Sequence, residues 1–227
     1  MAFDPSKYTV AKTRPLPVIL LLDRSGSMAG EKISTLNVAV NQMIESFKSA
    51  GQGEAEINLA VISFGGDVSY DIPLQPVAEL SDCRLQANGG TPMGAALSMA
   101  KDLLEDKERI PSKGYRPAVV LVSDGAPTDE WEKPMDDFVE GGRSSKCQRF
   151  AMAIGTSQDD PVLNRFMHRM EQSVYLASDA TKIRDFFQFV TMSVSQRSRS
   201  QNPNALPPPG SKSQNITDLA RGFGIDL

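Results

Sequence analysis

The chain has 227 residues, a net charge of −4 and a pI of about 5.1. This length accommodates one folded domain with extensions, and the slightly acidic balance argues against a nucleic-acid-binding surface. The two cysteines are too few for a disulfide framework, residues 1–15 contain no apolar signal core, and no run approaches the roughly 18 apolar residues of a membrane span, so we expect a cytoplasmic protein without a membrane partner.

The first predicted strand covers residues 17–23. Its apolar run, 18–22, shows no alternation, which is typical of a strand buried on both faces. Asp23, Ser25 and Ser27 follow in a tight loop that leads into a helix predicted over residues 30–49. Because open α/β sheets bind ligands outside the carboxyl ends of their strands, this loop is the first candidate for a functional site.

The second predicted strand, 57–64, is followed by a turn and by an alternating, half-exposed segment, 68–74. Pro73 and Pro76 restrict this second segment to the edge of a sheet, since proline donates no hydrogen bond to a neighbouring strand. We therefore expect an antiparallel edge hairpin in this part of the chain.

The remainder of the chain alternates between helices and strands. After two glycines, Thr91 is a good N-cap and Pro92 a good first helical residue. Apolar runs and helical spacing predict the further elements: strands over 118–124, 150–155 and 174–177, and helices over about 93–106, 128–140, 160–170 and 179–195. This order predicts a three-layer, doubly wound, Rossmann-like α/β fold with a mostly parallel central sheet and one antiparallel edge strand.

The expected organisation is an N-terminal extension over 1–15, one domain over 16–196 and a flexible C-terminal tail over 197–227. The tail is rich in Ser, Arg, Asn and Gln and contains a proline run, as flexible linkers do. Within it, residues 215–223 place apolar side chains on one face of a short helix. This segment either docks on the domain or on a partner, or it is a solvated extension.

Oxygen-bearing side chains follow two predicted strands and open one predicted helix. Asp23, Ser25 and Ser27 form the first group, Thr91 follows the glycine pair, and Asp124 ends the strand over 118–124. Carboxylates and hydroxyls suit Mg²⁺, Mn²⁺ or Ca²⁺ rather than zinc or copper. Because three residues do not fill the coordination shell of such an ion, the two later groups are expected to complete the site.

The same residues carry a resemblance to a known family. Asp23-x-Ser25-x-Ser27, Thr91 after two glycines and Asp124 before a glycine resemble the metal-ion-dependent adhesion site (MIDAS) of von Willebrand factor A (VWA) domains, over residues 14–195. The resemblance implies that the hydroxyls bind Mg²⁺ (or Mn²⁺ or Ca²⁺), that the two aspartates bind it directly or through water, and that one position stays open for a carboxylate of a partner protein.

Within this family, the whole-chain pattern is most similar to bacterial tellurite-resistance-associated, TerY-like VWA proteins. That similarity implies a stress-response system in which a kinase or a phosphatase is the partner. The leading expectation is therefore a non-catalytic, metal-dependent protein-interaction module.

Alternatives stay open at this stage. Ser25 and Ser27 could be N-cap residues of a helix rather than ligands, and Arg24 is expected to be a solvent-exposed charge rather than a group that pairs with a partner. The chain could also be a co-factor subunit of an AAA+ ATPase of the chelatase type, or a metal-dependent phosphoesterase. The sequence offers no base or nucleophile for the last, since the lone His168 lies away from every predicted strand end.

Overall fold

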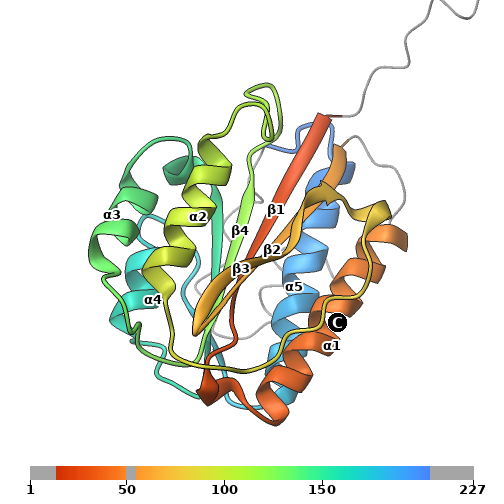
Figure 1. The fold of residues 1–227 in the computed structure, drawn as a ribbon. Helices are drawn as coiled ribbons and strands as arrows, with labels where there is room; N and C mark the ends of the chain where they lie inside the picture. Colours follow the sequence, from red (N-terminus) through yellow and green to blue (C-terminus); the bar gives the residue numbers. More distant parts are fainter. Residues whose placement is uncertain (1–13, 50–54, 205–227) are drawn as a thin grey trace, which may run out of the picture.

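The computed structural model describes residues 14–49 and 55–204 and shows a six-stranded sheet in the order β3-β2-β1-β4-β5-β6 (Figure 1). Only the β2–β3 pair is antiparallel among these neighbours, so the predicted α/β fold with one antiparallel edge strand is confirmed. The strands are β1 (Arg14–Asp23), β2 (Ala55–Gly65), β3 (Asp67–Pro76), β4 (Ala118–Ser123), β5 (Gln148–Ile154) and β6 (Tyr175–Ala177).

Helices cover both faces of the sheet, which gives three layers (Figure 1). On one face lie α1 (Glu31–Ser49) and α5 (Ala180–Arg199), and on the other lie α2 (Met93–Glu105), α3 (Glu132–Glu140) and α4 (Pro161–Phe166). Short 3-10 turns occur at Gly26–Met28, Val77–Glu79 and Ser144–Lys146. Within the described ranges, no helix combines the length and the apolar character needed to cross a membrane.

Strand β1 lies at the centre of the sheet, between β2 and β4. Its side chains alternate between the two cores: Leu20 and Leu22 pack toward α1 and α5, whereas Ile19 and Leu21 pack toward α2 and α3. This two-sided burial explains the unbroken apolar run in the sequence. Because β1 and β4 are parallel neighbours, the loops that follow them emerge at the same edge of the sheet.

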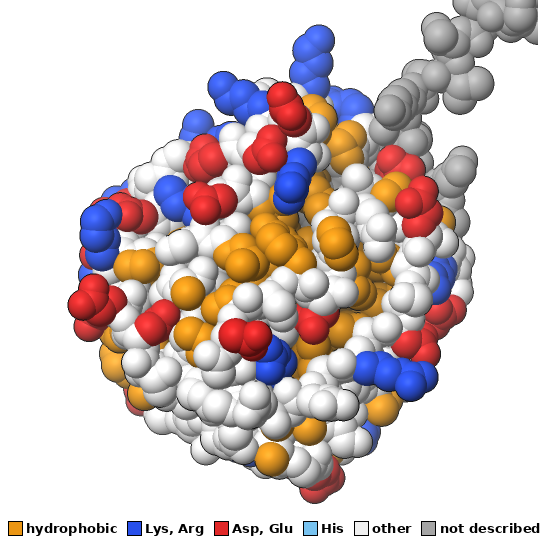
Figure 2. All heavy atoms as spheres, viewed as in Figure 1, with side chains coloured by type: hydrophobic (Ala, Val, Ile, Leu, Met, Phe, Trp, Pro, Cys, Tyr) orange, Lys and Arg blue, Asp and Glu red, His pale blue; other side chains and the backbone are white. Residues whose placement is uncertain are grey.

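Strand β3 forms one edge of the sheet, as Pro73 and Pro76 predict. Its half-buried Val68, Tyr70 and Leu74 pack against the core under α2 and α3. Figure 2 shows hydrophobic side chains in the middle of this face of the molecule, with charged side chains around them. The prolines and the flanking charges protect the edge against pairing with another strand.

Three helix boundaries differ from the sequence-based expectation. Helix α4 ends at Phe166 rather than near residue 170, and residues 167–169 form a turn. Helix α3 begins at Glu132 rather than at Thr128, because Asp129 binds a different helix, as described below. Helix α5 continues to Arg199 rather than ending near residue 195. Arg197 is buried there and donates hydrogen bonds to the side chain of Gln148 and to two backbone carbonyls, so the end of α5 is fixed to the domain.

Candidate functional site

The first element of the site is the Asp23 carboxylate at the carboxyl end of β1, which is fully buried. The backbone N–H of Ser25 donates to its Oδ1 at 2.8 Å, and the hydroxyl of Ser123, the last residue of β4, donates to its Oδ2 at 2.6 Å. Burial raises the pKa of Asp23, although the hydrogen bonds from Ser123 and Ser25 oppose that shift. Both carboxylate oxygens are therefore held in place by the ends of two adjacent strands.

A chain of hydrogen bonds joins the two serines of this loop to the second aspartate. The hydroxyl oxygens of Ser25 and Ser27 lie 3.0 Å apart, and the Ser27 hydroxyl donates to Asp124 Oδ1 at 2.6 Å. Ser25 is buried whereas Ser27 is exposed, so the site opens to solvent at Ser27. Four of the five predicted residues are thus connected within one small region at the lower edge of the sheet in Figure 1.

A residue that the sequence analysis missed completes the environment of Asp124. The ammonium group of Lys32, in the first turn of α1, donates to Asp124 Oδ2 at 2.5 Å. The Asp124 side chain is inaccessible to solvent, whereas that of Lys32 is 37% exposed. The only sequence signal for this ion pair is a lysine at the start of the helix that follows the Asp23 loop.

The glycine pair before Thr91 packs directly against the Asp23 loop. Gly26 N–H donates to the Gly89 carbonyl at 2.8 Å, and Gly66 N–H donates to the Gly90 carbonyl at 2.9 Å. Gly89 has φ +65°, and a Cβ there would lie 2.4 Å from the Cα of Gly66. Only glycine fits at this position, and this close packing brings the segment that carries Thr91 to the site.

Thr91 is buried but does not cap α2. Pro92 stands at the N-cap position and the helix begins at Met93, so the predicted N-cap and the predicted first helical residue are both wrong. The helix is capped from another loop instead: Asp129 accepts hydrogen bonds from the backbone N–H groups of Gly94 and Ala95 at 3.0 and 2.9 Å. Among the described residues, Thr91 forms its hydrogen bonds through its backbone, with Thr128 and Met93. The Thr91 hydroxyl is therefore not used by the helix end.

The donor set fits a hard divalent cation. Ser25 precedes a 3-10 turn but its side chain makes no capping hydrogen bond, which contradicts the interpretation of this serine as a helix cap. No group of three His, Cys, Asp or Glu side chains suited to a metal occurs in the described parts of the chain. Ion binding here would therefore depend on neutral hydroxyls together with two carboxylates, which are oxygen ligands of the kind that Mg²⁺ or Mn²⁺ accepts.

Arg24 is not the solvent-exposed charge expected from the sequence. Its side chain is only 13% exposed; Nε donates to the Ser63 hydroxyl at 2.9 Å and the guanidinium forms an ion pair with Asp67. These contacts fix the β2–β3 turn to the Asp23 loop, so Arg24 holds this loop against β2 and β3. His168 is exposed, and its carbonyl accepts a hydrogen bond from Arg149 near the start of β5, whereas Asp23 lies at the carboxyl end of β1.

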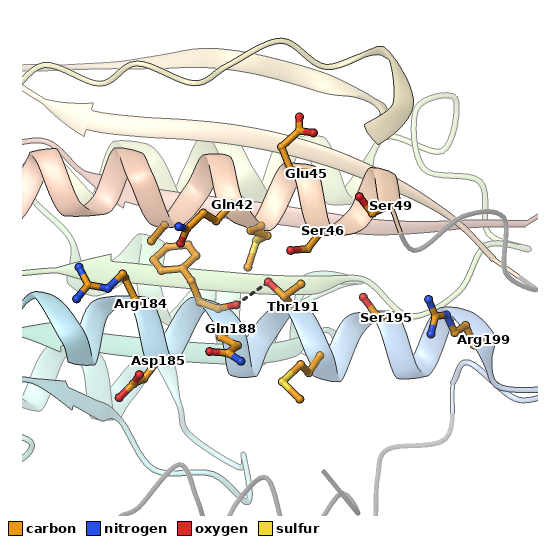
Figure 3. Close-up of a pocket in the computed structure, with 14 residues that line it drawn as sticks. Gln42, Glu45, Ser46, Ser49, Arg184, Asp185, Gln188, Thr191, Ser195 and Arg199 are labelled. Atoms are coloured by element: carbon orange, nitrogen blue, oxygen red, sulfur yellow. Dashed lines mark hydrogen bonds between the residues drawn. The ribbon is translucent and has the colours of Figure 1, made fainter. Parts of the chain in front are cut away.

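A hollow of about 910 Å³ lies between α1 and α5 and contains none of the predicted site residues (Figure 3). Its floor includes the buried side chains of Met43 and Phe187, and its walls carry polar groups such as Gln42 and Gln188. The Thr191 hydroxyl donates to the Phe187 carbonyl at 2.6 Å within α5. The lining residues include neither a histidine nor a cysteine.

Comparisons with known proteins give the family and the fold of this chain. A family model described as "von Willebrand factor type A domain" matches residues 18–189. Matrilin-3 of Gallus gallus is 25% identical over 160 residues, which are 65% of this chain and 33% of that protein. Inter-alpha-trypsin inhibitor heavy chain H4 of Bos taurus is 27% identical over 196 residues, which are 78% of this chain and 20% of that protein. The chain thus spans a third or less of the length of these relatives.

Two solved structures share the fold. The pilus adhesin SpaC from Lactobacillus rhamnosus GG, in its open conformation, superposes with a TM-score of 0.64 at 16% identity, covering 82% of this chain and 31% of that one. A von Willebrand factor type A structure from Catenulispora acidiphila gives a TM-score of 0.64 at 18% identity, covering 79% of this chain and 42% of that one. At such low identities the likeness concerns the fold alone.

Proposed function

Because the chain belongs to the von Willebrand factor type A domain family, we propose that it is a non-catalytic interaction module which binds a divalent cation and, through it, a carboxylate of a partner protein. The observation that carries this proposal is the linked set of oxygen atoms from Asp23, Ser25, Ser27 and Asp124 at one sheet edge. This set lies close to the segment that carries Thr91, which supports the Thr91 hydroxyl as a fifth ligand.

The residues of this chain would divide the work as follows. The Ser25, Ser27 and Thr91 hydroxyls would bind the ion through oxygen lone pairs, and Ser27 could keep donating its proton to Asp124, as it does in this structure. Asp23 is held by Ser123 and balances charge close to the ion. A bound cation with few direct anionic ligands retains positive charge, and that charge attracts an aspartate or glutamate from outside.

The proposed partner is a protein that presents an acidic side chain. One structural neighbour is described as a pilus adhesin, which agrees with an interaction role for this fold. From the resemblance to TerY-like proteins, we further propose that this partner is a kinase or phosphatase of a tellurite or stress-response system in the bacterial cytoplasm. This narrower assignment stays a prediction, as does Mg²⁺ as the physiological ion.

Direct titration of the purified chain with MnCl₂ tests the cation site. Mn²⁺ has an electron paramagnetic resonance signal that distinguishes free from bound ion, and excess Mg²⁺ should displace it. We expect the Ser25→Ala/Ser27→Ala variant to lose binding, and the variant Ser112→Ala/Ser173→Ala, altered at two exposed serines outside the site, to bind as the wild type does. Equal Mn²⁺ binding by the two double variants would contradict the proposal.

Capture of partners from a bacterial lysate then tests the second part of the proposal, which is recognition of a partner protein through the bound cation. A partner retained in Mg²⁺ but not in EDTA, and lost in Ser25→Ala/Ser27→Ala, supports metal-dependent recognition. A partner retained equally in all four conditions binds another surface.

A further inference from the structure

We propose that Lys32 lowers the affinity of this site for the cation. We propose further that it raises the affinity of the cation-loaded site for an external carboxylate. This inference rests on the proposed function and concerns a residue that the five-residue motif does not contain. It follows from the ion pair between Lys32 Nζ and Asp124 Oδ2.

The Lys32 ammonium group binds one of the two oxygens of the buried Asp124 carboxylate. Asp124 Oδ1 accepts from Ser27 at 2.6 Å and Oδ2 accepts from Lys32 at 2.5 Å, so both oxygens already have donors. The side chain of Asp124 is excluded from solvent, and removing a paired charge from such a carboxylate is costly. Any cation bound at Ser25 and Ser27 must therefore share Asp124 with an existing positive charge.

The residue that follows β5 lies next to this ammonium group. Gly155 follows β5 with φ +68°, and a Cβ at that position would come within 3.7 Å of Lys32 Nζ. Its N–H donates to the Ala177 carbonyl at 2.9 Å, which holds the glycine at the sheet edge. A Cβ at this distance would be in ordinary van der Waals contact, so Gly155 borders the lysine but does not by itself fix the position of the ammonium group.

The charges determine the direction of the effect. Asp23, Asp124 and Lys32 together carry a net charge of minus one, and a divalent cation would bring the group to plus one. Without the lysine, the same ion would bring it to zero. Lys32 therefore opposes entry of the ion by charge repulsion and leaves the loaded site positive, which favours an acidic ligand. Removal of the charge at Lys32 should therefore strengthen cation binding and weaken carboxylate binding, so one substitution tests both effects.

The test uses the full chain as wild type, Lys32→Gln and Lys32→Arg, with Lys133→Gln as a matched control. Lys133 is an exposed lysine that also pairs with an aspartate, Asp137 on α3, but outside the site. Titration with MnCl₂ alone should show about tenfold tighter binding for Lys32→Gln, the order expected for one unit charge at a partly exposed site. Lys32→Arg and Lys133→Gln should stay within about twofold of the wild type, since both keep the charge at Asp124.

The second measurement titrates acetate into the Mn²⁺-loaded proteins and follows the relaxation of water protons on the ion. We expect acetate to bind several-fold more weakly to Lys32→Gln than to the wild type, Lys32→Arg or Lys133→Gln. Far-UV circular dichroism establishes that each variant is folded. If Lys32→Gln does not fold, Lys32→Met replaces it, since its unbranched side chain fills a similar volume without charge.

Two different failures are distinguishable. If Ser25→Ala/Ser27→Ala abolishes Mn²⁺ binding but Lys32→Gln binds Mn²⁺ no more tightly than the wild type, the role of Lys32 is wrong and the cation site stands. If the wild type and the double serine variant bind Mn²⁺ alike, the cation site itself is wrong, and the inference fails with it. Unchanged acetate binding in Lys32→Gln also overturns the inference.

Discussion

The hydroxyl of Ser123 at the end of β4 donates to Asp23 at the end of β1, 2.6 Å away. Asp23 is fully buried, so this bond supports a carboxylate that water does not reach. We expect Ser123→Ala to lower the free energy of unfolding by about 1–3 kcal/mol, the cost of leaving a buried acceptor unsatisfied. Urea denaturation measures the change, and Ser112→Ala, at an exposed serine, should be within about 0.5 kcal/mol of the wild type. A stable Ser123→Ala protein would show that Asp23 is supported in another way.

We predict that Gly89 tolerates no side chain for two reasons: its positive φ and the lack of space for a Cβ. Gly30 shares the positive φ but has free space, so a comparison of the two positions separates these causes. Gly89 has φ +65° and no room for a Cβ, which would lie 2.4 Å from the Gly66 Cα, whereas Gly30 has φ +84° and no atom within 4 Å of a Cβ. Gly30→Ala should cost about 1–2 kcal/mol from backbone strain alone. Gly89→Ala should lower the free energy of unfolding by clearly more, because the backbone at Gly66 must also move to make room for the Cβ.

Thermal and urea unfolding of the two glycine variants checks this difference. Displacement of the loop by Gly89→Ala should also weaken Mn²⁺ binding, since the same segment carries Thr91. Equal destabilisation by the two substitutions would mean that the loop shifts freely, and the packing of Gly89 on Gly66 would not be needed for the fold.

The local patterns of the sequence were sufficient to predict the order of the elements and four connected residues of the site. Unbroken apolar runs mark β1 and β4 because both faces of the sheet are covered. Asp23 is the last residue of β1, and Asp124 follows the last residue of β4. The position of a side chain at the end of a buried parallel strand follows from the strand itself. For this reason spacing alone placed Asp23, Ser25, Ser27 and Asp124 at one edge.

Contacts between distant segments could not be predicted in the same way. Lys32 and Asp124 are separated by 92 positions and Gly94 and Asp129 by 35, and no local periodicity records that they meet. Arg24 and Arg197 were misjudged for the same reason, because charged side chains are usually solvated and only the tertiary structure supplies their partners. The 215–223 segment lies outside the described residues, so both alternatives for it, docking and a solvated extension, stay predictions.

Thr91 and Asp129 are predicted to have separate roles although they lie at the same helix end. Asp129→Ala removes the acceptor for two N–H groups of α2 and should lower the free energy of unfolding by about 0.5–2 kcal/mol. Thr91→Val, which keeps the shape of the side chain, should change stability much less, because its hydroxyl does not cap the helix.

Mn²⁺ titration provides the converse measurement for this pair. Thr91→Val should weaken Mn²⁺ binding, whereas Asp129→Ala should leave the affinity nearly unchanged at temperatures where the variant is folded. The assignment of Thr91 as a ligand is wrong if Thr91→Val binds Mn²⁺ as tightly as the wild type.

Both cysteines are predicted to be unreactive while the chain is folded. Cys83 and Cys147 are each 2% exposed, and burial raises the pKa of each thiol to about 12. A raised pKa keeps the thiol protonated at pH 8, and only the thiolate attacks a disulfide reagent. With Ellman's reagent at pH 8 we therefore expect almost no colour from the native protein and two equivalents of thiol after denaturation in guanidinium chloride. Rapid release of one equivalent from the native chain would mean that the segment around that cysteine opens locally, and the single variants Cys83→Ser and Cys147→Ser would identify which one.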